Sequence, residues 1–192
     1  MARVLRLVAV GLVAMLAVAA CGKDEESPQV APAASTPQVV SSGTLTAGEK
    51  IAPPKDEVVL ELSGEIGAPN QGKKLALDLA SLEQMRTMRL EATEPYVKKK
   101  LQFEGVLLSD LLALANVPPS ATKLQVTALD DYKVDFSLAD VRSSKMLLAT
   151  KTDGAHMPVE KAGPIRIVFP DDSSLGRNPG LWIWSISTMK VS

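Results

Sequence analysis

Apolar and polar residues alternate over several short stretches between residues 56 and 192. A period of two is typical of strands that bury one face. The alternating positions are Val58, Leu60 and Leu62; Leu75 and Leu77; Met88, Leu90 and Ala92; Leu124, Val126 and Ala128; Val134 and Phe136; Ile165, Ile167 and Phe169; and Trp182, Trp184 and Ile186. The pattern predicts strands at these places.

Helical signals are fewer and shorter. The clearest covers residues 109–115, where Ser109 is placed to cap the first turn and two prolines follow the end. Ser81 and Gln84 have the spacing of a capping box, and Ser137 precedes a single predicted turn. The sequence thus predicts two or three short helices.

Asp153 and Gly154 separate two short stretches of strand-forming residues and predict a tight hairpin turn. Many strands with few helices indicate an α+β class. We therefore predict one domain over residues 56–192, with a mixed or antiparallel, β-rich architecture.

The first 20 residues have the layout of an export signal. Arg3 and Arg6 precede an apolar run over residues 7–16, and small residues follow up to Cys21. The alternative is an uncleaved anchor helix, which would need about 20 consecutive apolar residues.

Val18-Ala19-Ala20-Cys21 resembles the lipobox of bacterial lipoproteins. The resemblance implies that residues 1–20 are a signal peptide that is removed, and that Cys21 carries acyl chains such as palmitate. It also implies a periplasm-facing protein of the cell envelope. Gly22 after the cysteine favours the outer membrane over the inner one.

Residues 21–55 are rich in proline, alanine, serine and charge, and they contain no aromatic residue. Such a composition cannot bury enough apolar surface to offset its ordering entropy. We expect a disordered tether that adds nothing to the stability of the domain.

Cys21 is the only cysteine of the chain. Lipidation would use it, leaving no disulfide, thiolate nucleophile or thiolate metal site in the domain. Without Arg3 and Arg6 the chain has 21 − 2 = 19 basic and 22 acidic side chains, a net charge of −3. This balance does not suggest nucleic acid as a partner.

A series of motifs resembles the oxidoreductase molybdopterin-binding domain, the catalytic fold of sulfite oxidase and its relatives. It starts with an aromatic residue, a glycine and a leucine-rich helix over residues 103–112. It continues, in order, through residues 131–132, 147–149, 153–154 and 163–170, and closes on Trp182-Ile183-Trp184. The resemblance covers about residues 75–190 and implies a sulfite oxidase-like fold.

The chain departs from these relatives at the metal. They hold molybdenum through a cysteine thiolate, whose place falls near Ala92-Thr93-Glu94, where no cysteine is present. The dithiolene of the cofactor could still hold the metal without a protein ligand. The relatives also carry a basic residue before the closing tryptophan, where this chain has Leu181; Arg177 could replace it in part.

The resemblance brings Thr93, Glu94, Asp131, Tyr132 and Arg177 to the ancestral pocket, and these are the candidate pocket residues. A solvated turn is the alternative for the acidic residues before the tyrosine. His156, the only histidine, is interpreted as an exposed hairpin residue, and no metal ligands or catalytic residues are predicted.

Two functions remain open. The first is an accessory module, anchored to the membrane by its lipid, that binds a small anionic ligand or an envelope protein and needs no cofactor. The second is an oxidoreductase that binds molybdopterin without a protein thiolate.

Overall fold

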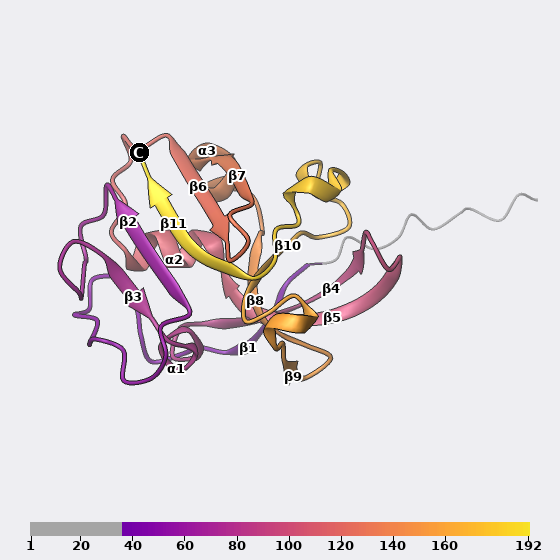
Figure 1. Cartoon of the computed structure of the whole chain (residues 1–192), viewed down its shortest axis with the longest axis horizontal. Coiled ribbons are helices and arrows are strands. Elements are labelled where there is room, and N and C mark those ends of the chain that lie inside the picture. Colours follow the sequence, from indigo (N-terminus) through magenta and orange to yellow (C-terminus); the bar gives the residue numbers. More distant parts are fainter. Residues whose placement is uncertain (1–35) are drawn as a thin grey trace, which may run out of the picture. The chain divides into compact units, whose positions relative to one another are not determined.

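The computed structural model describes residues 36–192, which form two β-sheets with short helices (Figure 1). The predicted export signal and Cys21 lie outside the described residues. The first sheet has the order β1-β4-β5-β8-β10, with β9 paired to β8. Its strands are β1 (Gln38–Ser41), β4 (Thr87–Glu94), β5 (Lys99–Leu107), β8 (Leu147–Thr152), β9 (Ala155–His156) and β10 (Arg166–Val168).

The second sheet has the order β3-β2-β11-β6-β7. Its strands are β2 (Leu60–Gly64), β3 (Leu75–Leu77), β6 (Lys123–Ala128), β7 (Lys133–Ser137) and β11 (Ile186–Val191). Within the described part of the chain only β2 and β11 pair in parallel, and the other pairs are antiparallel. The predicted α+β class with a mixed, β-rich architecture is confirmed.

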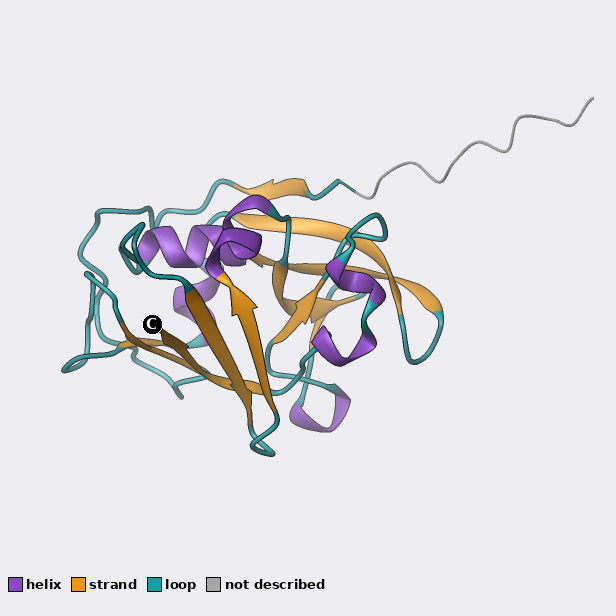
Figure 2. Cartoon of the chain, turned by 90° about the horizontal axis from the view of Figure 1, so that it is seen from above, coloured by secondary structure: helices purple, strands orange, loops and turns teal. Residues whose placement is uncertain are grey.

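The helices are α1 (Leu79–Glu83), α2 (Leu108–Leu114) and α3 (Leu138–Ser143), with 3₁₀ turns η1 (Val159–Lys161), η2 (Leu175–Arg177) and η3 (Pro179–Leu181). The α-helices lie toward one end of the sheets and the 3₁₀ turns toward the other (Figure 2). No helix within residues 36–192 is long and apolar enough to cross a membrane.

One hydrophobic core joins the two sheets. It includes Phe103 on β5, Leu111 on α2, Val126 on β6 and Phe169 after β10, all fully buried. Gly105 lets β5 approach β8 closely, because a side chain there would collide with the carbonyl oxygen of Leu148.

Two of the three predicted helix starts are displaced. Asp78, not Ser81, caps α1, and its carboxylate accepts the N–H of Ser81 at 2.7 Å. Strand β5 runs directly into α2, so the helix begins at Leu108 without a side-chain cap, and Ser109 lies inside it. Ser137 does cap α3, as predicted, by accepting the N–H of Ala139.

The hairpin turn at Asp153 and Gly154 is confirmed. Both residues have positive φ, and the flanking Thr152 and Ala155 pair across the turn. The strand predicted over residues 182–186 is wrong, since β11 begins only at Ile186. The alternation there has another cause: Trp182 is buried while Trp184 is partly exposed at a cavity.

The tether predicted over residues 21–55 is wrong for residues 36–55, and residues 21–35 lie outside the described residues. Strand β1 pairs with β4, and the backbone N–H groups of Thr44 and Leu45 donate to the carbonyl of Gln84. Ile51 is buried in the core. Apolar residues are sparse in this segment. It is held instead by backbone hydrogen bonds to β4 and Gln84, which leave no periodic pattern of apolar residues in the sequence.

Asp78 fixes the end of the segment formed by residues 36–55. Its carboxylate accepts the N–H groups of Lys55 and Asp56 at 2.9 and 3.1 Å. Burial opposes its ionisation, but the hydrogen bonds from Ser81, Asp56 and Lys55 outweigh burial and lower its pKa to about 2. Residues 36–55 therefore belong to the domain.

We predict that removing β1 destabilises the domain. A chain that begins at Ser42 should unfold about 3–6 °C below one that begins at Pro37, because it loses the β1–β4 backbone hydrogen bonds, together worth about 1–2 kcal/mol. Thermal unfolding followed by circular dichroism measures the difference. Equal melting temperatures would show that β1 does not contribute.

Candidate functional site

A buried ion pair lies at the end of β4, where the β4–β5 hairpin turns. Arg166 on β10 donates from Nη2 to Oε1 of Glu94 at 2.9 Å. Only 4% of Glu94 and 6% of Arg166 is exposed. The other carboxylate oxygen accepts the N–H groups of Tyr96 and Val97, both at 2.8 Å. Each oxygen of Glu94 thus has a protein partner, and the carboxylate fixes the turn.

The guanidinium of Arg166 lies between aromatic rings. It is 5.6 Å from the ring centroid of Phe103 and 5.9 Å from that of Trp184, within the range of cation–π attraction. Its Nε is buried and has no hydrogen-bond partner in the described chain. The ring faces therefore supply part of the stabilisation that a further acceptor would give.

A cavity of about 290 Å³ lies beside this pair, between three segments distant in sequence. The segments are the β4–β5 turn, the β6–β7 turn, and the chain from η3 to β11. The lining residues are Tyr96, Ala128, Asp130, Tyr132, Gly180, Trp182, Ile183 and Trp184. In Figure 1 the β4–β5 turn lies near the segment with η2 and η3, and the hydroxyl of Tyr96 donates to the carbonyl of Pro179 at 3.0 Å.

The aromatic walls of the cavity are held in place by the protein. The rings of Tyr96 and Trp184 meet edge to face, with centroids 5.0 Å apart and planes at 79°. Tyr132 donates from its hydroxyl to the carbonyl of Gly180 at 3.1 Å. Trp182 forms the floor, where its Nε1 donates to the carbonyl of Gly176 at 2.8 Å. The cavity is therefore formed without a ligand.

The structure separates the five predicted pocket residues. Tyr132 lines the cavity, and Asp131 lies beside it in the β6–β7 turn with φ of 65°. Glu94 is enclosed in the ion pair. Thr93 is exposed and bonded to Asp171, through its N–H at 2.6 Å and its hydroxyl at 3.3 Å.

Arg177, the fifth, lies on η2 and is exposed. Within the described chain its side chain has no hydrogen-bond or ion-pair partner, and it does not line the cavity. It stands one residue before the Asn178 cap of η3.

Sequence reasoning missed Tyr96 and Trp184 as cavity residues, while Asp130, which precedes the predicted Asp131 and Tyr132, does line the cavity. Trp182 and Phe103 are both buried in the core. A usable signal was present in the composition: the chain has two tyrosines and two tryptophans, and all four line this one cavity.

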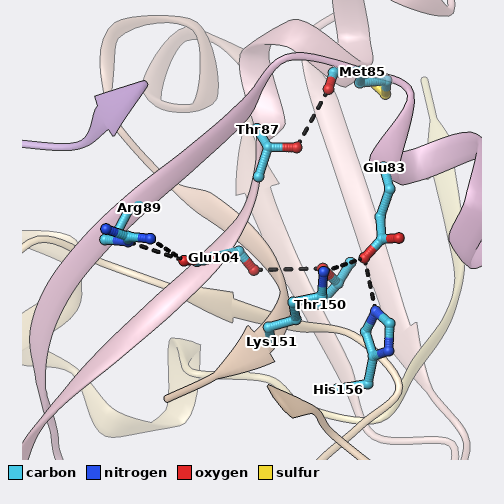
Figure 3. Close-up of polar contacts among 8 residues, drawn as sticks. All are labelled: Glu83, Met85, Thr87, Arg89, Glu104, Thr150, Lys151 and His156. Carbon is cyan, nitrogen blue, oxygen red and sulfur yellow. Dashed lines mark hydrogen bonds and ion pairs between the residues drawn. The ribbon is translucent and has the colours of Figure 1, made fainter. Parts of the chain in front are cut away.

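A second polar cluster lies on the surface between α1 and β8 (Figure 3). Oε1 of Glu83 contacts Nζ of Lys151 and Nε2 of His156, each at 2.7 Å. Burial opposes ionisation of Glu83, but its hydrogen bonds to Lys151 and His156 prevail and lower its pKa. His156 is exposed, as expected, and also pairs with Glu83. The cluster joins the β8–β9 hairpin to α1, which is a structural role.

Carboxylates, cysteines and histidines do not gather into a metal site anywhere in residues 36–192. The ionisable groups near the cavity are instead distributed. Glu94 is used by Arg166, and Asp130 accepts the N–H of Tyr132 through Oδ1 at 3.1 Å.

Residues 71–190 match the oxidoreductase molybdopterin binding domain family. The match covers more than half of the chain, so the chain belongs to this family. The resemblance expected from the sequence is confirmed for the globular domain. The chain matches no curated protein sequence.

Among solved structures, the chain is similar to the crystal structure of the sulfane dehydrogenase SoxCD from Paracoccus pantotrophus. The TM-score is 0.55 and the identity 18%, and the similarity covers 74% of this chain and 40% of that chain. This chain therefore spans less than half of that larger protein. The likeness establishes the fold.

We predict that breaking the Glu94–Arg166 pair strongly destabilises the domain. Glu94→Gln should cost about 3–5 kcal/mol in urea unfolding, because the change leaves Arg166 buried without a counter-charge. The exposed pair of Lys74 and Glu61 is the control, and Glu61→Gln should cost less than about 1 kcal/mol.

Replacing both charges tests the cause. Glu94→Leu with Arg166→Met should recover at least about half of the lost stability, since no charge is then buried. A double variant as unstable as the single one would contradict this explanation and assign the loss to the turn hydrogen bonds.

Proposed function

We propose that this chain is an exported, lipid-anchored accessory module that uses the molybdopterin-domain fold to bind a ligand or partner, without redox chemistry. The observation that carries the proposal is the carboxylate at the end of β4, which three donors of the protein already engage. There, both oxygens of Glu94 are occupied by Arg166 and by backbone N–H groups.

The residues at this strand end do not fit a molybdenum centre held by a protein thiolate. Residues 36–192 contain no cysteine. The side chains at this place are Ala92, Thr93 and Glu94, of which Ala92 offers no donor and Thr93 is bonded to Asp171. A hard carboxylate already paired with a guanidinium is also a poor replacement for a soft thiolate.

The cavity supports a binding role. Its volume of about 290 Å³ is close to the lower end of the range for small-molecule sites, and aromatic residues dominate its lining. Three of its rings are partly exposed and fixed by hydrogen bonds or ring contacts. Preformed, exposed aromatic surface is typical of recognition sites.

An oxidoreductase that binds molybdopterin without a thiolate is the second candidate, and membership of the family favours it. Anchoring such a cofactor would depend on charge-assisted bonds to its phosphate, worth roughly 1.5–3 kcal/mol each. Arg177 is the exposed, unpaired cation closest in sequence to the η3 wall of the cavity. A single arginine is a weak anchor for this cofactor.

The metal content separates the two candidates. Full-length protein made in a host with molybdate and an intact cofactor pathway should contain far less than one molybdenum per chain by elemental analysis. Thr93→Cys, which adds a thiol at the strand end, is the follow-up variant. One metal per chain in the unmodified protein would overturn the accessory role in favour of a redox enzyme.

The membrane anchor is part of the proposal and rests on Val18-Ala19-Ala20-Cys21. Two or more acyl chains would hold the domain at the envelope nearly permanently, since each buried methylene contributes about 0.8 kcal/mol. Gly22 favours the outer membrane. Intact mass spectrometry of detergent-extracted protein should give an acylated chain that starts at Cys21, and Cys21→Ala should abolish acylation. An unmodified full-length mass would contradict the anchor.

A further inference from the structure

The aromatic residues of this chain are distributed in an unusual way. All tyrosines and tryptophans line the cavity between the β4–β5 turn, the β6–β7 turn and η3. Three of the four are not core residues, because Tyr96, Tyr132 and Trp184 are 53%, 50% and 38% exposed. Exposed aromatic surface gathered at one hollow marks a recognition site rather than a packing requirement.

The rings form a fixed corner. Trp184 and Tyr96 stand nearly perpendicular, with centroids 5.0 Å apart, and Tyr132 adds a third aromatic side. Both tyrosine hydroxyls already donate to backbone carbonyls of η3. The tyrosines therefore offer a ligand exposed aromatic surface and oxygen lone pairs, and not a free O–H donor.

The only charged side chain in the lining is a carboxylate. Asp130 uses Oδ1 to accept the N–H of Tyr132, while Oδ2 has no hydrogen-bond partner within the described chain. The lining contains no lysine, arginine or histidine. The guanidinium of Arg166, which lies 5.9 Å from the ring centroid of Trp184 outside the lining, is paired with Glu94 at 2.9 Å.

We propose that this cavity binds a small organic cation with an alkylated ammonium group. This inference rests on the proposed binding function and names its ligand class. Aromatic faces attract cations through the ring quadrupole, and alkylated ammonium groups are well suited to aromatic cages. The carboxylate of Asp130 adds charge complementarity, and the alkyl groups contact the apolar floor.

Other ligand classes fit this lining less well. An anion, which the sequence left open, would meet the charge of Asp130 without any basic partner in the lining. A neutral apolar ligand would remove water from that carboxylate without replacing its hydrogen bonds. An alkylated ammonium cation is attracted both by the aromatic rings and by the carboxylate of Asp130.

Choline and its neutral carbon isostere 3,3-dimethylbutan-1-ol test the inference directly. Titration calorimetry on the full-length protein should give saturable binding of choline and at least about 10-fold weaker binding of the isostere. The two probes have nearly the same shape, so the difference measures the charge. Sodium sulfate serves as the anionic probe and should not bind in the cavity.

Two variants locate the site. Trp184→Leu keeps an apolar side chain but removes the ring, and should weaken choline binding about 3- to 30-fold. Asp130→Asn should weaken it about 2- to 5-fold and reduce its salt dependence. Asp172→Asn, at an exposed acid outside the lining, should leave it unchanged. If Trp184→Leu fails to fold by circular dichroism, Asp130→Asn and the isostere decide the question.

Three outcomes would each overturn the cation inference. They are equal binding of choline and the isostere, sulfate binding that Trp184→Leu abolishes, and no saturable binding of choline. The first two results would leave the accessory binding role intact with another ligand class. The proposed function is tested separately by elemental analysis, where one molybdenum per chain would overturn it.

Discussion

The buried pair of Glu94 and Arg166 is the constraint on which the candidate site depends. Burying two charges costs several kcal/mol per ion, and only close geometry with further hydrogen bonds offsets that cost. Here Glu94 receives three donors, and Arg166 lies against two aromatic rings. One interaction thus connects the end of β4, strand β10 and Trp184. It also fixes the backbone of Tyr96, so two walls of the cavity depend on it.

The same pair also limits the chemistry available at the end of β4. The carboxylate at this strand end is a hard ligand already engaged by a guanidinium and two backbone N–H groups, whereas the neighbouring hollow offers aromatic surface and one unpaired carboxylate oxygen. The fold by itself does not determine the function, which depends on the side chains that the fold brings together.

Much of the fold could be predicted from the sequence because alternation directly reports which side of a strand is buried. Along β4 the buried residues include Met88, Leu90 and Ala92, as the pattern requires. The tether boundary could not be predicted in this way, since β1 is attached by backbone hydrogen bonds and its side chains are exposed. A backbone pairing leaves no periodic trace in the sequence.

The candidate site was only partly predictable for a different reason. Glu94 and Arg166 are 72 residues apart, and nothing in the local sequence indicates that they meet. Tyr132 was found through the family resemblance. Tyr96 was missed because it lies in the turn between β4 and β5. Trp184 was missed because its place in an alternating apolar pattern predicted a strand residue.

The placement of every indole and phenol around one hollow also determines how the protein can be observed by light. Trp182 is buried against Phe169 and Trp184 lies at the rim, so intrinsic emission combines a shielded and a partly solvated indole from the same location. The spectrum of the native protein therefore reports the state of this hollow rather than an average over the domain. A loosening confined to the η3 segment would shift the emission while the far-ultraviolet signal of both sheets stayed constant.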